Sequence, residues 1–191
     1  MQFGSPGRRA AMAGLFSLVG TMTPKAQERE IDRALSDAVA SGDLTRIAAL
    51  LREGAAVDAR DRSGRTPLLV ATRANKPPVA RLLIASGADV NAQDEIQDSP
   101  FLYAAAEGRL EILRLCLAAG ADLKSTNRYG GTALIPAAHH GHVETVRALL
   151  ATPIDVDHVN RLGWTALLEA LILGDGGPAH TETVRLLAPR R

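Results

Sequence analysis

The stretch that decides the fold reads DRSGRTPLLVA over residues 61–71 and PVARLLIASGADVNA over residues 78–92. The same pattern of residue types returns every 33 residues along most of the chain. Equivalent positions form columns: Asp61, Asp94, Asn127 and Asn160; Thr66, Ser99, Thr132 and Thr165; Ala38, Ala71, Ala104, Ala137 and Ala170. A fixed period of this length indicates one supersecondary unit stacked on copies of itself.

Each unit carries the signals of two short helices. Thr66 is placed to cap the first helix, and Pro67 follows at the first helical position, where its missing N–H costs nothing. Gly87 stands where the second helix must end, because glycine supplies a left-handed C-cap. Gly64 fits a tight turn that needs a positive φ. In the next unit Gln97 takes this place, so we expect that turn to be strained or rearranged.

These units resemble the ankyrin repeat of bacterial-type ankyrin repeat domain proteins. The match lies in the D-x-x-G-x-T-P-L opening (residues 61–68), the apolar second helix and the G-A-D-V-N-A close (residues 87–92). The resemblance runs from about residue 31 to residue 188. It implies an all-α solenoid of stacked helix-turn-helix units joined by β-hairpin-like loops. The fourth motif position, usually His in the family, is apolar here: Leu69, Leu102, Ile135 and Leu168.

We expect one ankyrin repeat domain over residues 23–191. Its five units lie at about residues 28–60, 61–93, 94–126, 127–159 and 160–191. The first unit is a degenerate cap with a charged first helix, which suits a terminal unit with one face in water.

The fifth unit differs from the others in length and at its end. The interval from Thr132 to Val146 is 14 positions, whereas the equivalent interval from Thr165 to Val184 is 19. The extra residues fall at about 174–178, where we expect a loop. The unit also lacks the closing motif, which leaves an apolar flank without a polar cap: Leu171, Val184, Leu186 and Leu187.

Residues 1–22 stand apart from the repeats as a leader. Arg8 and Arg9 precede an apolar stretch, the outline of a secretory signal of the twin-arginine type, but no clean cleavage site follows. Alternatively, Met22 is the true start and Thr23 caps a helix that begins at Pro24. We favour this second interpretation and a cytoplasmic protein; a periplasmic or secreted protein with a twin-arginine-type leader is the alternative. The apolar stretch is too short for a conventional membrane span.

Composition excludes several classes of function. The formal net charge is +1, which gives no general attraction to nucleic acid. The only cysteine, Cys116, lies in an apolar helix, so we expect a buried thiol and no internal disulfide. Four arginines recur on the second helices and suit a solvated outer face: Arg81, Arg114, Arg147 and Arg185.

The only histidine cluster is His139, His140 and His142. Imidazoles bind zinc, but no carboxylate or thiol stands at ligand spacing beside them. The glycines at 174–177 lack the Gly-Lys-Ser/Thr of a phosphate loop. We therefore predict no cofactor, no metal and no catalysis. The alternative is a metal-dependent regulator or enzyme that uses His139, His140 and the loop around Asp175.

Residues that the fold leaves free are the candidates for binding a partner. In ankyrin-like stacks these are the hairpin tips and the ends of the first helices, which together line a concave face. The helix ends include Arg73 and Glu107, and the tips include Asp98. From all these positions we select Arg62, Arg65, Ile96, Arg128, Tyr129, His139, His140, Arg161, Leu162 and Trp164.

Aromatic residues and arginine are the types that most often anchor interfaces. The repeat predicts that Tyr129 lies near Leu162 and Arg128 near Arg161. Two adjacent cationic tips favour an acidic, partly apolar peptide. The competing interpretation is that Tyr129 and Trp164 only pack on neighbouring hairpins.

The sequence thus predicts a non-catalytic protein–protein interaction module with an unidentified protein partner. It predicts neither nucleic-acid nor small-molecule binding and no stable membrane insertion. We expect a monomer, with dimerisation through the truncated C-terminal repeat as the alternative. If the leader is a genuine signal, an accessory subunit that stabilises a secreted enzyme is a further alternative.

Overall fold

The computed structural model describes residues 24–188, and the side chains from residue 29 onward. The leader and the predicted cap at Thr23 lie outside the described residues. Within them the secondary structure consists of helices and turns, without a β-strand. The inner helices are α1 (Pro24–Ser41), α3 (Pro67–Arg73), α5 (Pro100–Ala106), α7 (Leu134–His139) and α9 (Ala166–Ile172). The outer helices are α2 (Leu44–Arg52), α4 (Pro77–Ala85), α6 (Leu110–Ala118), α8 (Val143–Leu150) and α10 (Pro178–Leu187).

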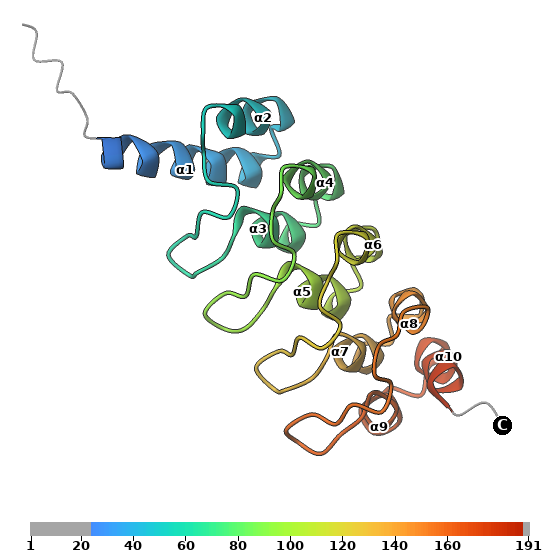
Figure 1. The fold of residues 1–191 in the computed structure, drawn as a ribbon. Coiled ribbons are helices and arrows are strands. Elements are labelled where there is room, and N and C mark those ends of the chain that lie inside the picture. The colour runs from blue at the N-terminus through green and yellow to red at the C-terminus, as the bar shows by residue number, and fades with distance from the viewer. Residues whose placement is uncertain (1–23, 189–191) are drawn as a thin grey trace, which may run out of the picture.

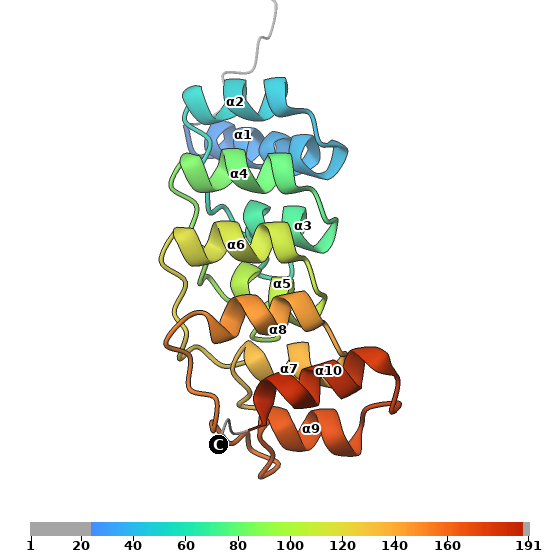
Figure 2. The same ribbon diagram turned by 90° about the vertical axis from the view of Figure 1, so that its right-hand side faces the viewer.

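The helices form two stacked rows (Figure 1). The inner helices make one row, the outer helices make the other, and four hairpin-shaped loops project beyond the inner row. Figure 2 shows the outer helices lying one above another along the stack. The predicted all-α solenoid of helix-turn-helix pairs is confirmed. We call the ends of the four loops the tips, and the surface between the tips and the inner helices the groove.

The predicted caps begin three of the inner helices. The side-chain oxygens of Thr66, Ser99 and Thr165 accept the N–H three residues later, at 3.3, 3.1 and 3.3 Å. Such caps satisfy N–H groups that a helix start leaves unpaired. The fourth unit differs: Ile135 N–H bonds the backbone carbonyl of Thr132 at 3.2 Å, and α7 begins only at Leu134.

A carboxylate or amide at the start of each tip holds its shape. Asp61 Oδ1, for example, accepts the N–H groups of Ser63 and Arg65 at 2.9 and 3.0 Å. The tips then need a residue with positive φ, which Gly64 supplies at 72°. Gln97 adopts φ 63° at the equivalent place, so the predicted strain is confirmed.

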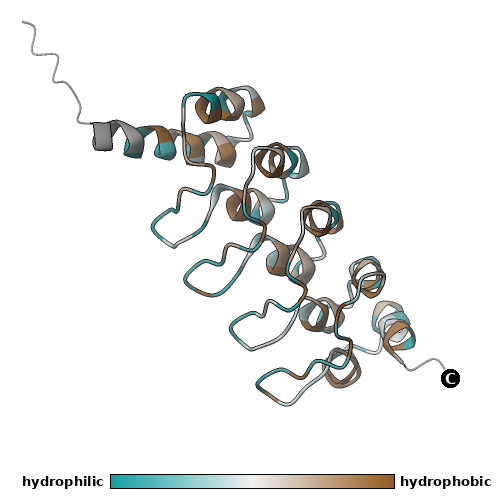
Figure 3. Cartoon of the chain, viewed as in Figure 1, coloured by the Kyte–Doolittle hydropathy of each residue, from teal (hydrophilic) through white to brown (hydrophobic). Residues whose placement is uncertain are grey.

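The core lies between the two rows, where the helices turn their apolar faces toward each other (Figure 3). The alanine column is buried, which lets successive inner helices pack closely: Ala38, Ala71, Ala104, Ala137 and Ala170. Phe101 fills the centre of the stack without solvent exposure. Cys116 is buried in α6 as predicted, and this burial raises the pKa of its thiol to about 12.

Basic side chains tie consecutive units together through backbone carbonyls. Lys76 Nζ donates to the carbonyl of Ala40, His142 Nε2 to that of Ala106 at 3.1 Å, and His180 Nε2 to that of His139 at 2.9 Å. On the outer face the recurring arginines are exposed, as predicted. Two of them form ion pairs between consecutive units: Arg81 with Glu111 at 3.1 Å and Arg147 with Glu182 at 3.3 Å.

The fifth unit keeps its helix pair and carries the extra residues as the predicted loop between α9 and α10. The apolar flank differs from the expectation. Leu171 is exposed, but Leu187 is buried and Val184 and Leu186 are half-buried against the core. The exposed apolar surface lies on α9 and the residue after it: Leu168, Leu171, Ile172 and Leu173. Among the described helices, none combines the length and apolarity needed to cross a membrane.

Candidate functional site

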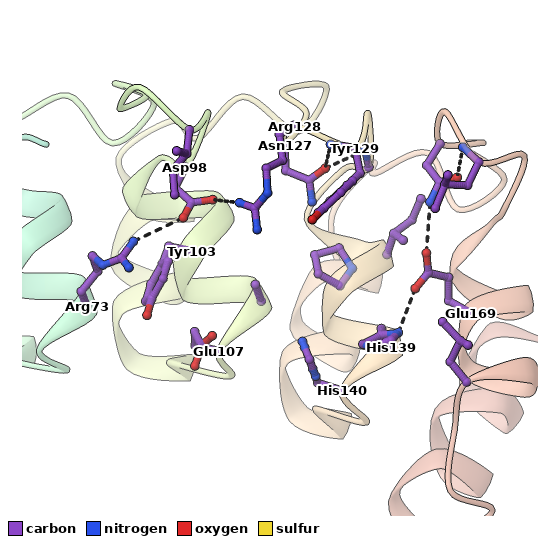
Figure 4. A pocket seen from close by; sticks show the side chains of 18 residues that line it. Arg73, Asp98, Tyr103, Glu107, Asn127, Arg128, Tyr129, His139, His140 and Glu169 are labelled. Atoms are coloured by element: carbon purple, nitrogen blue, oxygen red, sulfur yellow. Dashed lines mark hydrogen bonds and ion pairs between the residues drawn. The ribbon is translucent and has the colours of Figure 1, made fainter. Parts of the chain in front are cut away.

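The groove contains a cavity of about 520 Å³ between units three, four and five (Figure 4). Its outer rim comes from the tips and its inner wall from α5, α7 and α9. Residues that directly follow these helices also contribute, and α3 adds Arg73. We call this space the groove cavity.

The rim of the groove cavity is apolar. Ile96, Tyr129 and Leu162 occupy the same position on three successive tips, and they are 49%, 53% and 65% exposed. The backbone joins two of these tips, because Arg161 N–H donates to the carbonyl of Tyr129 at 3.0 Å. A single exposed apolar side chain is ordinary, but here three recur at the same position of successive tips along one cavity.

Two arginines and one carboxylate form a closed cluster at the third and fourth tips. Asp98 lies 3.3 Å from Arg73 and 3.6 Å from Arg128. Each guanidinium also stacks on a tyrosine: Arg73 lies 4.6 Å from the ring centre of Tyr103, and Arg128 lies 4.8 Å from that of Tyr129. Burial, followed by repulsion from Asp94, raises the pKa of Asp98. The charge of Arg128 is therefore already partnered.

The opposite end of the cavity carries carboxylates and imidazoles. Glu169 is only 8% exposed; its Oε1 accepts Asn160 Nδ2–H at 3.0 Å, and its Oε2 lies 2.9 Å from His139 Nδ1. The ring of His140 stands edge-on to that of His139, with centres 4.6 Å apart. Burial and the neighbouring His139 lower the pKa of His140. Glu107 faces the same space from the end of α5.

Gly131 leaves the middle of the cavity open. The equivalent positions in the other units carry side chains: Arg65, Asp98 and Trp164. The φ of Gly131 lies outside the left-handed region, and a Cβ there would meet Asn127 Oδ1 and Ile135 Cβ at 3.5 Å, an ordinary contact distance. The backbone therefore does not require glycine at position 131.

Six of the ten partner-binding residues predicted from sequence line the groove cavity: Ile96, Arg128, Tyr129, His139, His140 and Leu162. Four lie on the tips outside its lining: Arg62, Arg65, Arg161 and Trp164. Arg65 pairs with Asp61 at 2.7 Å, and Arg161 donates to the carbonyl of Arg128 at 2.9 Å, which confirms that the two tips are neighbours. Trp164 is half-buried.

The sequence analysis did not select several lining residues. Arg73, Asp98 and Glu107 were noted by position only, and Tyr103, Glu169 and Leu173 were missed. A signal for Glu169 was present, because its column holds Val70, Tyr103 and Pro136 in the other units. A carboxylate among uncharged residues marks a position that the fold alone does not explain.

The histidine cluster has a different geometry from a metal site. Within residues 24–188, His, Cys, Asp and Glu side chains form no group of three or more suited to hold a metal ion. His139 lies against Glu169, and Asp175 lies 2.8 Å from His180 Nδ1, so the loop carboxylate is partnered by another histidine.

Comparisons with known proteins agree with this architecture. The family model described as ankyrin repeats (3 copies) matches residues 9–94 and 101–191. An ankyrin repeat domain from Acinetobacter baumannii AYE is 60% identical, with a TM-score of 0.78 over 80% of this chain and 78% of that one. EF0377, an ankyrin repeat protein, is 43% identical, with a TM-score of 0.78 over 81% and 79% of the two chains. No curated protein matches the sequence. The family model covers nearly the whole chain and the solved structures share its fold, so the chain belongs to the ankyrin repeat family.

Proposed function

We propose that this chain is a non-catalytic module that binds a partner protein in the groove, centred on the groove cavity. Ankyrin repeats generally act as protein–protein interaction modules and are typically not enzymes. The observation that carries the proposal is the apolar column of Ile96, Tyr129 and Leu162 along the edge of a cavity of about 520 Å³.

The tips suit this role because they are held in place before a partner arrives. The side chain of the first residue of each tip accepts hydrogen bonds that close the tip; Asn127 Oδ1, for example, accepts the N–H groups of Tyr129 and Gly131 at 2.9 and 3.0 Å. Stacked repeats add contacts on both sides. A rigid surface of this kind loses little conformational entropy on binding, so more of the contact energy appears as affinity.

Tyr129 is the central anchor of the proposed surface. It lies between Ile96 and Leu162 in the column, and Arg128 covers one face of its ring. Aromatic residues near the centre of an interface contribute most to affinity, whereas residues at the edge contribute little. Trp164, Arg161, Arg62 and Arg65 lie outside the cavity lining and would contribute contacts at the edge.

The test is truncation of the central anchor. We expect Tyr129→Ala to weaken binding of a captured partner about 30-fold, which corresponds to roughly 2 kcal/mol. Its unfolding midpoint should stay close to that of the parent, because the side chain is more than half exposed. Isothermal titration against the purified partner measures the first quantity and thermal unfolding the second.

Val159→Ala is the matched control, since Val159 is also exposed and apolar but lies outside the cavity lining. It should bind as the parent does. Equal affinity of the parent and Tyr129→Ala would show that the groove cavity is not the binding site. A large loss in Trp164→Ala alone would move the site to the fifth tip.

A further inference from the structure

We propose that the groove cavity is a specificity pocket for a lysine or arginine side chain of the partner, flanked in the partner by apolar residues. This inference rests on the proposed function and names the chemistry that the groove selects. It replaces the expectation from the sequence that the partner is an acidic peptide.

The distribution of charge gives the sign of the occupant. On one side of the cavity, Asp98 pairs with both Arg73 and Arg128 and offsets one of their two charges. On the other side stand Glu107 and Glu169, with the imidazoles of His139 and His140 between and beside them (Figure 4). The lining as a whole holds three carboxylates, Asp98, Glu107 and Glu169, against the two arginines, so a cationic side chain is attracted to it. An acidic side chain there would meet like charge, which is unfavourable at short range.

Glu107 is placed where it does not help the fold. It stands at the C-terminal end of α5, where the helix dipole repels negative charge. The nearest guanidinium among the described side chains, that of Arg109, is 4.0 Å away, and both side chains are substantially exposed. Equivalent positions in the other units hold Ala74, His140 and Leu173. A local rule broken with only this long, partly exposed ion pair in compensation is expected at functional sites.

Glu169 is a carboxylate held in position before binding. It is nearly buried, and Asn160 and His139 contact one oxygen each. Each carboxylate oxygen has two lone pairs, so Glu169 can accept a further hydrogen bond from an ammonium or guanidinium group. The cost of burying this charge is already borne by the folded chain, which favours a charged partner group over a neutral one.

The rest of the cavity suits the aliphatic part of a lysine or arginine side chain. Such side chains lay their stems on apolar surface and keep the charged head near polar groups. Tyr129, Leu162 and Leu173 supply the apolar surface, and Gly131 contributes no side chain to the lining. The volume of about 520 Å³ lies within the range of about 300–1,000 Å³ that is usual for ligand pockets.

The experiment uses a random peptide library displayed on phage and selected against the whole chain. We expect the selected peptides to share a lysine or arginine beside apolar residues. A synthetic selected peptide should lose affinity about tenfold when its cationic residue is replaced by norleucine, which keeps the stem and removes the charge. Fluorescence anisotropy measures both affinities.

Glu107→Gln assigns the effect to the pocket. It should lower the affinity for the cationic peptide several-fold and leave the affinity for the norleucine peptide unchanged. In a double-mutant cycle this result indicates a direct interaction between Glu107 and the cationic residue. Its Tm should be equal to or above that of the parent, because the helix end loses an unfavourable charge. Glu144→Gln is the control, since Glu144 is exposed on the outer helix α8. This variant should bind both peptides as the parent does.

The outcomes separate this inference from the proposed function. One outcome overturns the cation pocket and leaves the groove as the binding site. In that outcome Tyr129→Ala weakens peptide binding, but neither the norleucine replacement nor Glu107→Gln changes the affinity. Selected peptides rich in Asp or Glu overturn it as well. If no selected peptide or captured partner is sensitive to Tyr129→Ala, the proposed function fails and the inference fails with it.

Discussion

Gln97 is the residue whose backbone conformation conflicts most clearly with its side chain. It adopts φ 63° at the third tip, where the equivalent residues are Gly64, Gly130 and Gly163. The left-handed conformation costs an L-residue with a Cβ roughly 1–2 kcal/mol relative to glycine. The side chain of Gln97 is exposed, so its removal uncovers little.

We expect Gln97→Gly to stabilise the chain by about 1 kcal/mol and to raise Tm by about 2–4 °C. Urea and thermal unfolding measure the two quantities. Glu95→Gly provides the comparison, because Glu95 lies on the same tip with an ordinary φ and gains only backbone freedom in the unfolded state. It should be neutral or destabilising. A Gln97→Gly variant less stable than the parent would contradict the assignment of strain.

What the sequence predicts at the residue scale depends on how local the cause is. Caps and turns follow from neighbours a few positions away, so Thr66 and Gln97 were predicted correctly. The pairing of Arg128 with Asp98 joins residues of adjacent units and became visible only once the tips were placed side by side. The burial of Glu169 likewise depends on Asn160 and His139 together.

At the scale of elements, α10 is fastened to its neighbours by His180. Nε2 donates to the carbonyl of His139, and Nδ1 lies 2.8 Å from Asp175 Oδ1. These contacts raise the pKa of His180 above its ordinary value, and the hydrogen bond to the His139 carbonyl has the larger effect. The folded chain therefore favours the protonated ring. The stabilisation is complete below the unfolded pKa of about 6.5 and is lost as pH rises through the higher folded value.

We expect His180→Gln to lower the urea midpoint most at about pH 5.5, and the difference from the parent to shrink by about pH 8. His140 and His142 have their pKa values lowered by burial, which acts in the opposite direction, but they are present in both proteins and cancel. His158→Gln is the control for the loss of a histidine–carbonyl hydrogen bond alone. His158 bonds the carbonyl of Gly130 at 2.8 Å, as His180 bonds that of His139. A difference that is constant with pH would contradict the role of the charged ring.

At the scale of the whole molecule, stability should vary along the stack. Within residues 24–188, units two to four contact a neighbour on each side, whereas the fifth unit contacts only the fourth and exposes the apolar side chains of α9. In a one-dimensional array, end units open more often than central ones. We expect amide exchange to be faster in α9 and α10 than in α3 to α8, as measured by mass spectrometry. Uniform protection would refute this gradient, and sedimentation at the same concentration would show whether a dimer covers α9.

The architecture of the whole molecule was predictable because a 33-residue period repeats the same local signals. The groove cavity was not, because it arises where the repeats differ. Gly131 removes a side chain, Glu169 replaces an uncharged residue, and Asp98 pairs with both Arg73 and Arg128. Periodicity predicts what the units share, and the site is formed by their departures from one another.

The open position at Gly131 has a consequence for the engineering of new binders. Because a Cβ there would meet its neighbours only at ordinary contact distance, Gly131→Ala should fold like the parent, and larger side chains can be tried from that variant. Each variant would offer a differently shaped or charged pocket on an unchanged scaffold. Recognition in this array is thus adjustable at one position, separately from the residues that keep the repeats stacked.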